Sequence, residues 1–430
     1  ILTVAVYAKE DKDALHVHLA DQRVCIGEGA PAGSYLNMDN ILAAAVNTRA
    51  DAIHPGYGFL AENADLPKAC EENGIIFIGP RSDTMRMLGD KTQAKQAALK
   101  NNVPMTPGSL GLTDFAQAEA EVEKIGYPVI FKAAAGGGGR GMRIVRKKED
   151  LKAAFDTASF EARSAFGDPT LFVEAYVQNA RHVEVQVLGD NYGNVIHLGE
   201  RDCSPQRRYQ KVIEEALPAN LDPEMMKGIA EAAVSLCKGI GYNGAGTCEF
   251  LVDKDRNQFY FMEVNTRIQV EHPVTEEITG VDLIKEMIEI AYGKELTLKQ
   301  EDIQFKGHAI ECRITAENSY NDFMPTPGRI TRFFAPNGTH VRVDTHCYDG
   351  YMISPFYDSL ICKLITTGDT REEALANMRK ALAGFVIEGV STNIDFLQFL
   401  INEPDFIAAD ISVNWIENTV LPKFLASKDQ

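Results

Sequence analysis

Positive charge is what this sequence has too little of. Its 430 residues include 43 lysines and arginines against 61 aspartates and glutamates, so the formal net charge is -18. Nucleic acids and anionic membranes attract proteins with clustered cations, so we expect neither as a partner. An anionic substrate must instead be bound by a local cluster of positive side chains.

Paired cysteines and long apolar runs are also lacking. The eight cysteines form no Cys-x-x-Cys pair and no zinc-like spacing with histidine, which favours reduced, buried thiols in a cytoplasmic protein. No apolar run reaches the ~18–20 residues of a membrane span, and no signal peptide is visible. Hydrophobic residues make up 45% and charged residues 24%, as in an ordinary globular protein, and the length allows two or three domains.

The most informative stretch is residues 259–272. It begins as a strand, because aromatic and apolar residues dominate it and alternate side chains of a strand point to opposite faces. Five polar residues share one face if the chain stays extended: Glu263, Asn265, Arg267, Gln269 and Glu271. A strand on the surface could show the same alternation without any function.

The preceding segment favours a metal site. Residues 246–252 read as a second strand and residues 253–258 as a turn, so the two strands are predicted to form a hairpin. A symmetric register places Glu249 opposite Glu263, which destabilises a hairpin by about 0.2–1 kcal/mol when nothing lies between them. A divalent cation between the two carboxylates would turn this repulsion into a stabilising interaction. Mg²⁺ suits such carboxylates together with substrate phosphates, which predicts a metal–nucleotide site.

The first hundred residues alternate between strands and helices, which predicts a parallel sheet flanked by helices. The predicted strands are 1–7, 23–26, 52–54 and 75–78, and the predicted helices are 12–19, 38–47, 64–72 and 83–101. Pro104–Gly108 reads as a linker, so we place a domain boundary near residue 105.

A glycine-rich loop follows. It joins a strand at 129–133 to a second strand at 142–146, and a helix comes only afterwards, at about 149–166. A Rossmann or Walker A loop opens a helix instead, so this order predicts a hairpin flap whose backbone amides close over phosphates. A plain flexible turn is the alternative. Lys132, on the first strand, favours phosphate binding because a lysine acts there as a point charge.

The remaining half is predicted to be mainly antiparallel. Strands are expected at 171–177, 181–188, 195–199, 329–334, 340–344 and 360–366, helices at 222–239, 281–292 and 371–385, and a polar tail at the end. A further strand holds Glu311 and Arg313. The loop 200–211 contains three cations within five residues, which makes it either an anion site or a solvated loop.

Taken together, these motifs resemble the ATP-grasp superfamily and, more narrowly, the biotin carboxylase family. The matching stretches are His54–Asn63, Gly89–Lys91, the flap 132–141, Arg181–Gln186, Glu200–Ser204, Gln206–Lys211, Glu263–Thr275 and Pro355–Ser359. They span nearly the whole chain. The resemblance implies an ATP-grasp architecture of mixed α/β and α+β class, with an N-terminal parallel α/β domain, a small glycine-flap lid and a C-terminal antiparallel-sheet domain. The implied boundaries are 1–88, a helix and linker at 89–105, 106–178 and 179–430.

The resemblance also implies the reaction. ATP and bicarbonate give carboxyphosphate, and the carboxyl group then moves to N1′ of biotin on a carrier. Glu271 is the implied base for bicarbonate, which Lys211, Arg267, Gln269 and Val270 bind. The implied residues on the biotin side are Tyr57, Gly58, Gln206 and Arg313, with Arg313 stabilising the biotin enolate. Tyr57 could instead serve packing alone, and Arg313 or Lys91 could be members of structural ion pairs.

Phosphoryl transfer depends mainly on positioning and charge stabilisation. The metal, Mg²⁺ or Mn²⁺, is assigned to Glu249 and Glu263 with Asn265 nearby. The implied ATP-binding residues are Lys91, Lys132, Gly138, Gly139, Glu174, Ala175, Tyr176, Val177, His182, Tyr209, Glu249 and Glu263. Three substitutions depart from the family pattern: Ala175 replaces a lysine of some relatives, Tyr209 a histidine and Ala135 a glycine. Relatives also begin with an additional strand and helix that this sequence does not show.

The expected partners are a biotin carboxyl carrier protein or domain, carboxyltransferase subunits or a carboxyltransferase domain, and a second copy of the chain. The leading hypothesis is the biotin carboxylase component of acetyl-CoA carboxylase in fatty-acid synthesis. Three alternatives remain: the same module from a pyruvate or propionyl-CoA carboxylase, a different ATP-grasp ligase, and a non-catalytic nucleotide-binding scaffold. The sequence alone does not decide the final acyl or keto-acid acceptor.

Overall fold

A computed structural model describes residues 1–109, 111–134 and 142–427. Its centre is an eight-stranded antiparallel sheet with the order β14-β13-β8-β9-β12-β15-β22-β20. The strands of this sheet are β8 (Ala180–Gly189), β9 (Val195–Asp202), β12 (Ile213–Ala216), β13 (Gly244–Asp253), β14 (Gln258–Asn265), β15 (His308–Thr315), β20 (Val341–Thr345) and β22 (Leu360–Gly368). The predicted antiparallel C-terminal region is therefore confirmed.

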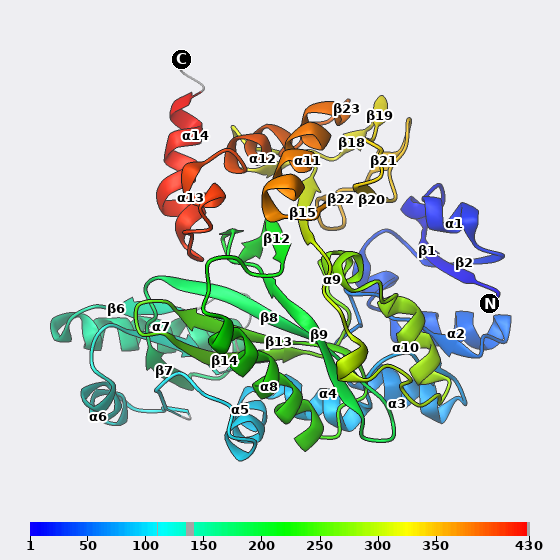
Figure 1. Ribbon diagram of the computed structural model, residues 1–430. Coiled ribbons are helices and arrows are strands. Elements are labelled where there is room, and N and C mark those ends of the chain that lie inside the picture. Colours follow the sequence, from blue (N-terminus) through cyan, green and yellow to red (C-terminus); the bar gives the residue numbers. More distant parts are fainter. Residues whose placement is uncertain (110, 135–141, 428–430) are drawn as a thin grey trace.

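Two groups of helices cover this sheet (Figure 1). Helix α8 (Pro223–Gly239) packs its apolar face on β8 and β9, and α11 (Arg371–Gly384) packs on β22 and β15. The other helices around it are α9 (His272–Thr279), α10 (Leu283–Ala291), α12 (Ile394–Leu400), α13 (Pro404–Ile407) and α14 (Leu421–Ser427). Short strand pairs complete this part: β10 (Gln206–Arg207) with β11 (Gln210–Lys211), β16 (Glu317–Asn318) with β17 (Met324–Pro325), β18 (Gly328–Arg329) with β21 (Met352–Ile353), and β19 (Arg332–Phe334) with β23 (Val386–Glu388).

The prediction of a polar tail is wrong. Apolar side chains between α12 and α14, among them Phe396, Phe406, Trp415 and Phe424, are buried in the same cluster as Ile310 and Cys312 of β15. Their spacing along short helices sends them to one side, while the polar residues between them remain outside. The end of the described chain therefore closes the hydrophobic core of the C-terminal region.

The N-terminal part contains parallel strand pairs, as predicted, but not one continuous sheet. β1 (Val4–Ala8) pairs with β2 (Gln22–Gly27), and β3 (Ala52–Ile53) pairs separately with β4 (Ile76–Phe77). Helices α1 (Leu15–Leu19), α2 (Met38–Thr48) and α3 (Asp65–Glu72) lie between them. β3 and β4 have two residues each, which is too little backbone to join the pairs into one sheet.

The predicted helix at 83–101 is in fact two helices, α4 (Ser82–Gly89) and α5 (Lys91–Lys100). Asp90 adopts an extended conformation between them, and its carboxylate accepts hydrogen bonds from the backbone N–H groups of Thr92 and Gln93. This is an N-cap, which begins a new helix and ends the previous one. The break sets the direction in which Lys91 enters the central cleft.

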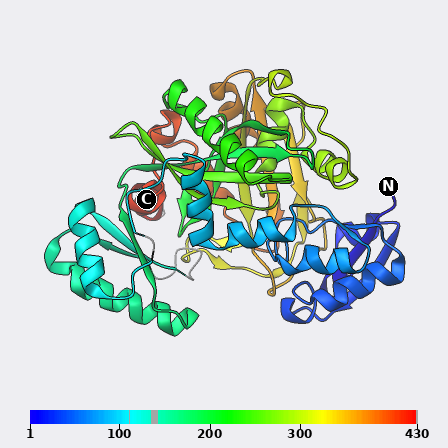
Figure 2. The same cartoon turned by 90° about the horizontal axis from the view of Figure 1, so that it is seen from below.

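The third part is a small lid (Figure 2). Its sheet has the order β6-β5-β7, with β5 at Val129–Ala133, β6 at Arg143–Val145 and β7 at Leu171–Ala175. Helices α6 (Phe115–Ile125) and α7 (Leu151–Phe166) pack on it through a separate apolar cluster. The order strand, loop, strand, helix is confirmed. Gly138 and Gly139, assigned to the flap, lie outside the described residues.

Both views place the lid and the N-terminal part on opposite sides of the central sheet (Figures 1 and 2). The longest described helix, α8, has 17 residues, and no helix within the described ranges is long and apolar enough to cross a membrane.

Candidate active site

A cavity of about 1140 Å³ lies where the central sheet, the lid and the N-terminal part meet. Nearly all of the described residues predicted for the site line it: Tyr57, Gly58, Lys91, Lys132, Glu174, Ala175, Tyr176, Val177, His182, Gln206, Tyr209, Lys211, Glu249, Glu263, Asn265, Arg267, Gln269, Val270 and Arg313. Residues distant in sequence therefore meet in one space of the size that ligand sites have. Glu271 is the exception, because it is fully buried beneath the cavity wall.

The predicted pair of opposed glutamates is present, but the hairpin is not symmetric, because its register shifts by one residue between Glu249 and Phe250. β13 and β14 are antiparallel, and Glu249 stands directly opposite Glu263. Glu249 is buried, whereas Glu263 is exposed to the cavity. Desolvation and the neighbouring carboxylate of Glu249 raise the pKa of Glu263. The Asn265 amide donates a hydrogen bond of 2.9 Å to Glu249 Oε1, so the three predicted metal-binding residues lie together.

The chain does not stay extended beyond this hairpin. β14 ends at Asn265, and α9 begins at His272 without having been predicted. Arg267 and Gln269 nevertheless reach the cavity, where Arg267 Nη1 donates to Gln269 Oε1 at 3.1 Å. Arg267 Nε also lies 3.2 Å from the Glu62 carboxylate. The convergence of these side chains comes from a turn and not from strand alternation.

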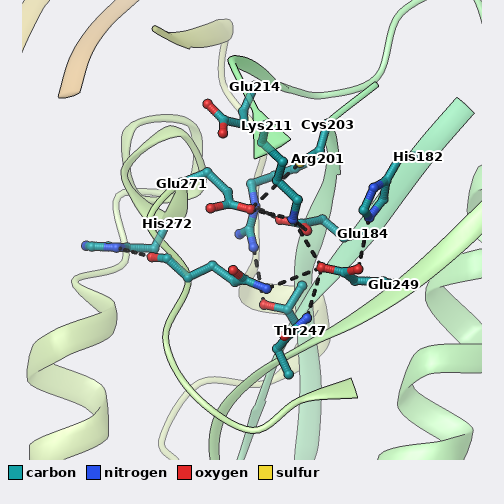
Figure 3. A network of polar contacts seen from close by, with 12 residues as sticks. His182, Glu184, Arg201, Cys203, Lys211, Glu214, Thr247, Glu249, Glu271 and His272 are labelled. Atoms are coloured by element: carbon teal, nitrogen blue, oxygen red, sulfur yellow. Dashed lines mark hydrogen bonds and ion pairs between the residues drawn. The ribbon is translucent and has the colours of Figure 1, made fainter. Parts of the chain in front are cut away.

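Lys211 is the centre of the charge network (Figure 3). Its ammonium group lies 2.5 Å from Glu184 Oε2, 2.7 Å from Glu271 Oε1 and 3.1 Å from Glu249 Oε1. Burial alone would lower the pKa of Lys211, but the surrounding acidic groups raise it well above its usual value. The lysine is therefore a permanent cation that holds three carboxylates around one point.

Glu271 is held by two cations. Arg313 Nη2 donates to Glu271 Oε2 at 2.8 Å on the side opposite Lys211. Burial would raise the pKa of Glu271, but the positive charges of Lys211 and Arg313 hold it well below its usual range. Glu271 is thus ionised at neutral pH, which is the state that a base requires.

The lid has its own ion pairs. The Glu174 carboxylate on β7 binds Lys132 of β5 at 2.6 Å and also contacts Lys95 of α5. Although burial opposes ionisation, these lysines lower the pKa of Glu174 to about 2. Lys95, which was not predicted, joins α5 to the lid through this ion pair with Glu174. Only tertiary structure brings it there.

The loop 200–211 was predicted to be either an anion site or a solvated loop, and its cations differ in this respect. Lys211 belongs to the site, whereas Arg208 is exposed and pairs with Asp322 at 2.9 Å. His182 Nε2 lies 3.2 Å from Glu249 Oε2, and its Nδ1 lies 2.6 Å from Gln206 Nε2. His182 and Gln206 are therefore on the floor of the cavity, as expected. Tyr209 is 59% exposed at the rim.

Glu184, Arg201, Cys203, Glu214 and Thr247 are site residues that the sequence analysis did not single out. β8 is buried throughout, yet it alternates valines with His182, Glu184 and Gln186. Polar residues at every second position of a fully buried strand indicate a polar site on that face. This signal was available in the sequence once the strand was known to be buried.

Arg201 explains how Glu184 can be buried. It is fully buried, and its guanidinium donates to Glu184 at 2.6 Å, Gln186 at 2.8 Å, Thr275 at 3.0 Å and Thr247 at 3.3 Å. The guanidinium group of Arg201 on β9 therefore links its own strand to β8, β13 and α9. A fully buried charge is tolerated when its hydrogen bonds are complete.

We expect Arg201→Met to destabilise the protein by about 3–5 kcal/mol, because it removes one of the two cations that hold the buried Glu184 and leaves the hydrogen bonds to Gln186, Thr247 and Thr275 unmade. Urea denaturation measures this change. Arg256→Met, at an exposed arginine on the turn of the β13–β14 hairpin, is the matched control and is expected to change stability by less than about 0.5 kcal/mol. Equal effects of the two variants would contradict the structural role of Arg201.

Two groups of ligand atoms lie close enough to hold a metal ion within the described parts of the chain. One consists of His182, Glu184 and Glu249, and the other of Glu184, Cys203 and Glu271. The Lys211 ammonium contacts all three carboxylates, and Glu184 and Glu271 each also bind an arginine, Arg201 and Arg313, so Glu249 is the one of the three without a guanidinium partner. Glu263, exposed to the cavity beside Glu249 and Asn265, leaves an oxygen-rich face that fits Mg²⁺ or Mn²⁺.

Three family models match the chain. They are described as "Biotin carboxylase, N-terminal domain" (residues 1–85), "Carbamoyl-phosphate synthase L chain, ATP binding domain" (90–299) and "Biotin carboxylase C-terminal domain" (311–418). Biotin carboxylase 1 of Bacillus subtilis is 52% identical over 97% of this chain and 93% of its own length.

Solved structures agree with these matches. The biotin carboxylase–β,γ-ATP complex of Campylobacter jejuni has a TM-score of 0.92 and 48% identity, covering 96% of this chain and 92% of that one. The biotin carboxylase domain dimer of Hydrogenobacter thermophilus 2-oxoglutarate carboxylase, solved with MgADP, ADP and bicarbonate, has a TM-score of 0.92 and 46% identity, covering 99% and 93%. The fold is that of the ATP-grasp class. Within that class, the chain belongs to the biotin carboxylase family.

Proposed function

We propose that this protein carboxylates biotin with bicarbonate at the expense of ATP. The observation that supports this most directly is the ionised Glu271, held between Lys211 and Arg313 beside a cavity large enough for a nucleotide. Bicarbonate is a poor nucleophile, so a base must take its proton as it attacks. A carboxylate whose charge is fixed by two cations serves that purpose.

In the first step, a bicarbonate oxygen attacks the γ-phosphorus of ATP, and ADP leaves as carboxyphosphate forms. Glu271 takes the bicarbonate proton, while Arg267, Gln269 and the Val270 backbone orient the anion. Lys91 on α5 and Lys132 in the lid line the cavity and are assigned to the phosphate oxygens of ATP. Glu249, Glu263 and Asn265 would hold Mg²⁺ or Mn²⁺, which neutralises charge on the phosphates when bound.

In the second step, the bond between the carboxyl carbon and the phosphate oxygen of carboxyphosphate breaks, and a bond from that carbon to N1′ of biotin forms. The released phosphate takes the proton that N1′ loses. Arg313 is assigned to stabilise the negative charge that develops on the biotin ureido oxygen. Tyr57, Gly58 and Gln206 also line the cavity and are assigned to biotin binding. Ala175, Tyr176 and Val177, at and just after the end of β7, are assigned to adenine, with Tyr209 at the rim.

The function is tested by bicarbonate-dependent ATP hydrolysis that free biotin stimulates. A non-catalytic scaffold would hydrolyse no ATP, and a different ATP-grasp ligase would show no response to biotin. Carboxybiotin formation from labelled bicarbonate completes the test.

We expect Glu263→Gln to raise the Mg²⁺ concentration needed for half-maximal ATP hydrolysis at least tenfold, because it removes one of the two opposed carboxylates. Titration of the hydrolysis rate with Mg²⁺ measures this. Asp255→Asn, in the exposed turn of the same hairpin, is the matched control and should leave the requirement unchanged. An unchanged requirement in Glu263→Gln would remove this residue from the metal site.

We further propose that the protein is the biotin carboxylase component of acetyl-CoA carboxylase, working in the cytoplasm as a homodimer with a biotin carboxyl carrier and a carboxyltransferase. The eight unpaired cysteines support a reducing compartment. The 46% identity to a 2-oxoglutarate carboxylase domain supports a keto-acid carboxylase as the second candidate. The two candidates are distinguished by comparing carboxylation of acetyl-CoA with that of keto acids by the chain copurified with its natural partners.

The domain boundaries at residues 88, 105 and 178 stay a prediction.

A further inference from the structure

Glu311 is a buried carboxylate that the proposed reaction does not use. It lies on β15, two residues before Arg313, and it is fully buried. Neither of its oxygens has a hydrogen-bond partner among the residues that the structure describes. A buried carboxylate anion without a partner is among the most costly arrangements in a protein interior.

A second carboxylate faces it. Glu214 on β12 stands directly opposite Glu311 in the antiparallel β12–β15 pair, so both side chains lie on the same face of the sheet. Glu214 is also fully buried. Its Oε1 accepts a hydrogen bond of 2.6 Å from Arg313 Nε, while its Oε2 has no partner among the described residues.

Nearby cations do not neutralise Glu311. Lys363 on β22 is directed to the Val270 carbonyl at 2.9 Å and to Asp344 at 3.5 Å. Arg313 binds Glu214 and Glu271. The titratable groups around Glu311 come from every element packed on this face: Glu214 on β12, Arg313 on β15, Lys363 on β22, Glu271 and His272 at the start of α9, and Tyr57 of the N-terminal part.

Two adjacent buried carboxylates cannot both be ionised without a cation between them. Glu214 is the member with a cationic partner, so the proton belongs on Glu311. A protonated Glu311 has an O–H group that can donate to the unpartnered Glu214 Oε2. Burial raises the pKa of both groups, that of Glu214 to about 7 and that of Glu311 well above its usual value. One proton on Glu311 thereby satisfies both carboxyl groups, while Glu214 keeps its hydrogen bond from Arg313.

We propose that Glu311 is a neutral carboxylic acid that positions Arg313 by donating a hydrogen bond to Glu214. The role of Arg313 toward biotin rests on the proposed function, whereas the protonated state of Glu311 does not. Burial and the carboxylates of Glu214 and Glu271 raise the pKa of Glu311 despite the charge of Lys363, in agreement with this geometry. Glu214 then holds Arg313 Nε while Glu271 holds its Nη2, which fixes the guanidinium plane.

The protonated state is tested by comparing wild type with Glu311→Gln, which mimics a neutral acid. An acid protonated in the folded state and ionised in the unfolded state makes stability fall as pH rises above about 4.3. The ratio of the unfolding constants, wild type over Glu311→Gln, should therefore rise about tenfold per pH unit, or about 100-fold between pH 5.5 and 7.5.

Urea unfolding followed by the fluorescence of the single tryptophan, Trp415, measures this ratio, because Trp415 belongs to the same core as β15. Glu301→Gln, at an exposed glutamate, is the control and should give a ratio that stays within about threefold. A ratio for Glu311→Gln that stays constant or falls with pH would show an ionised Glu311 and overturn the proposal. No substrate enters this measurement, so its failure is separate from a failure of the proposed function.

The positioning role is tested by kcat/KM for biotin. Glu311→Gln should keep it within about threefold of wild type, whereas Glu311→Ala should lower it at least tenfold and leave biotin-independent ATP hydrolysis within about threefold. Infrared spectra of the wild type at pH 7 should show a protonated carboxyl band that Glu311→Gln removes. Equal kcat/KM for wild type and Glu311→Ala, equal losses in the two variants, or the absence of the band would contradict the proposal.

Discussion

Replacing Glu271 by glutamine is expected to lower bicarbonate-dependent ATP hydrolysis by about 10²–10⁴-fold while leaving ATP binding largely intact. Glutamine keeps the shape of the side chain and its contact with Lys211, but it has no carboxylate to accept the bicarbonate proton. The depressed pKa of Glu271 means that wild type has this carboxylate ionised throughout the neutral range. Steady-state hydrolysis and equilibrium nucleotide binding measure the two quantities.

Glu231→Gln is the control for this prediction, since Glu231 is exposed on α8, away from the cavity lining. It should change neither quantity. If Glu271→Gln loses ATP binding together with turnover, the residue supports the nucleotide site and is not the base.

Replacing Arg313 by alanine is expected to lower biotin carboxylation by about 10²–10³-fold, the effect of removing one donor that stabilises developing negative charge. Bicarbonate-dependent ATP hydrolysis measured without biotin should fall much less, within about tenfold. The smaller loss arises because Glu271 keeps Lys211 as a partner after Arg313 is removed. Carboxybiotin formation and ADP release, assayed in parallel, give the comparison.

Arg332→Ala, at an exposed arginine that only approaches Glu388 at 4.0 Å, is the matched control and should affect neither reaction. Equal losses of both activities in Arg313→Ala would mean that this arginine supports the base or the fold and does not act on biotin. Loss of stability would appear in the same urea titration that is used for Arg201→Met.

Several elements of the site could be predicted from the sequence because their causes are local. The hairpin and the opposed Glu249–Glu263 pair were predicted correctly, but the turn at 253–258 does not set that pair. Counting back from Asp253 opposite Gln258 would place Glu249 opposite Met262, and a register shift between Glu249 and Phe250 brings it opposite Glu263 instead. The position of the glycine loop between two strands likewise predicted the architecture of the lid. The family followed from continuous motifs that span nearly the whole chain.

Other predictions failed where an alternative local interaction was stronger. Asp90 divides a predicted helix because its side chain caps the next helix. Chain extension beyond Asn265 was not required to bring Glu271 to the site, since a turn and α9 do so. The segment predicted to be a polar tail is folded, because its aromatic side chains pack into the hydrophobic core around β15.

By itself, the sequence determined most of the longer strands and helices and the kind of chemistry, because these depend on side-chain spacing along continuous segments. It did not predict β12, the short strand of the central sheet that holds Glu214. Only the tertiary structure decided which charges meet. Lys211, Glu184, Arg201, Arg313 and Glu311 lie on strands brought together by the order β13-β8-β9-β12-β15 and on the β10–β11 pair beside it. Spacing within one strand contains no information about which strand will lie beside it, since packing of the whole sheet selects its neighbours.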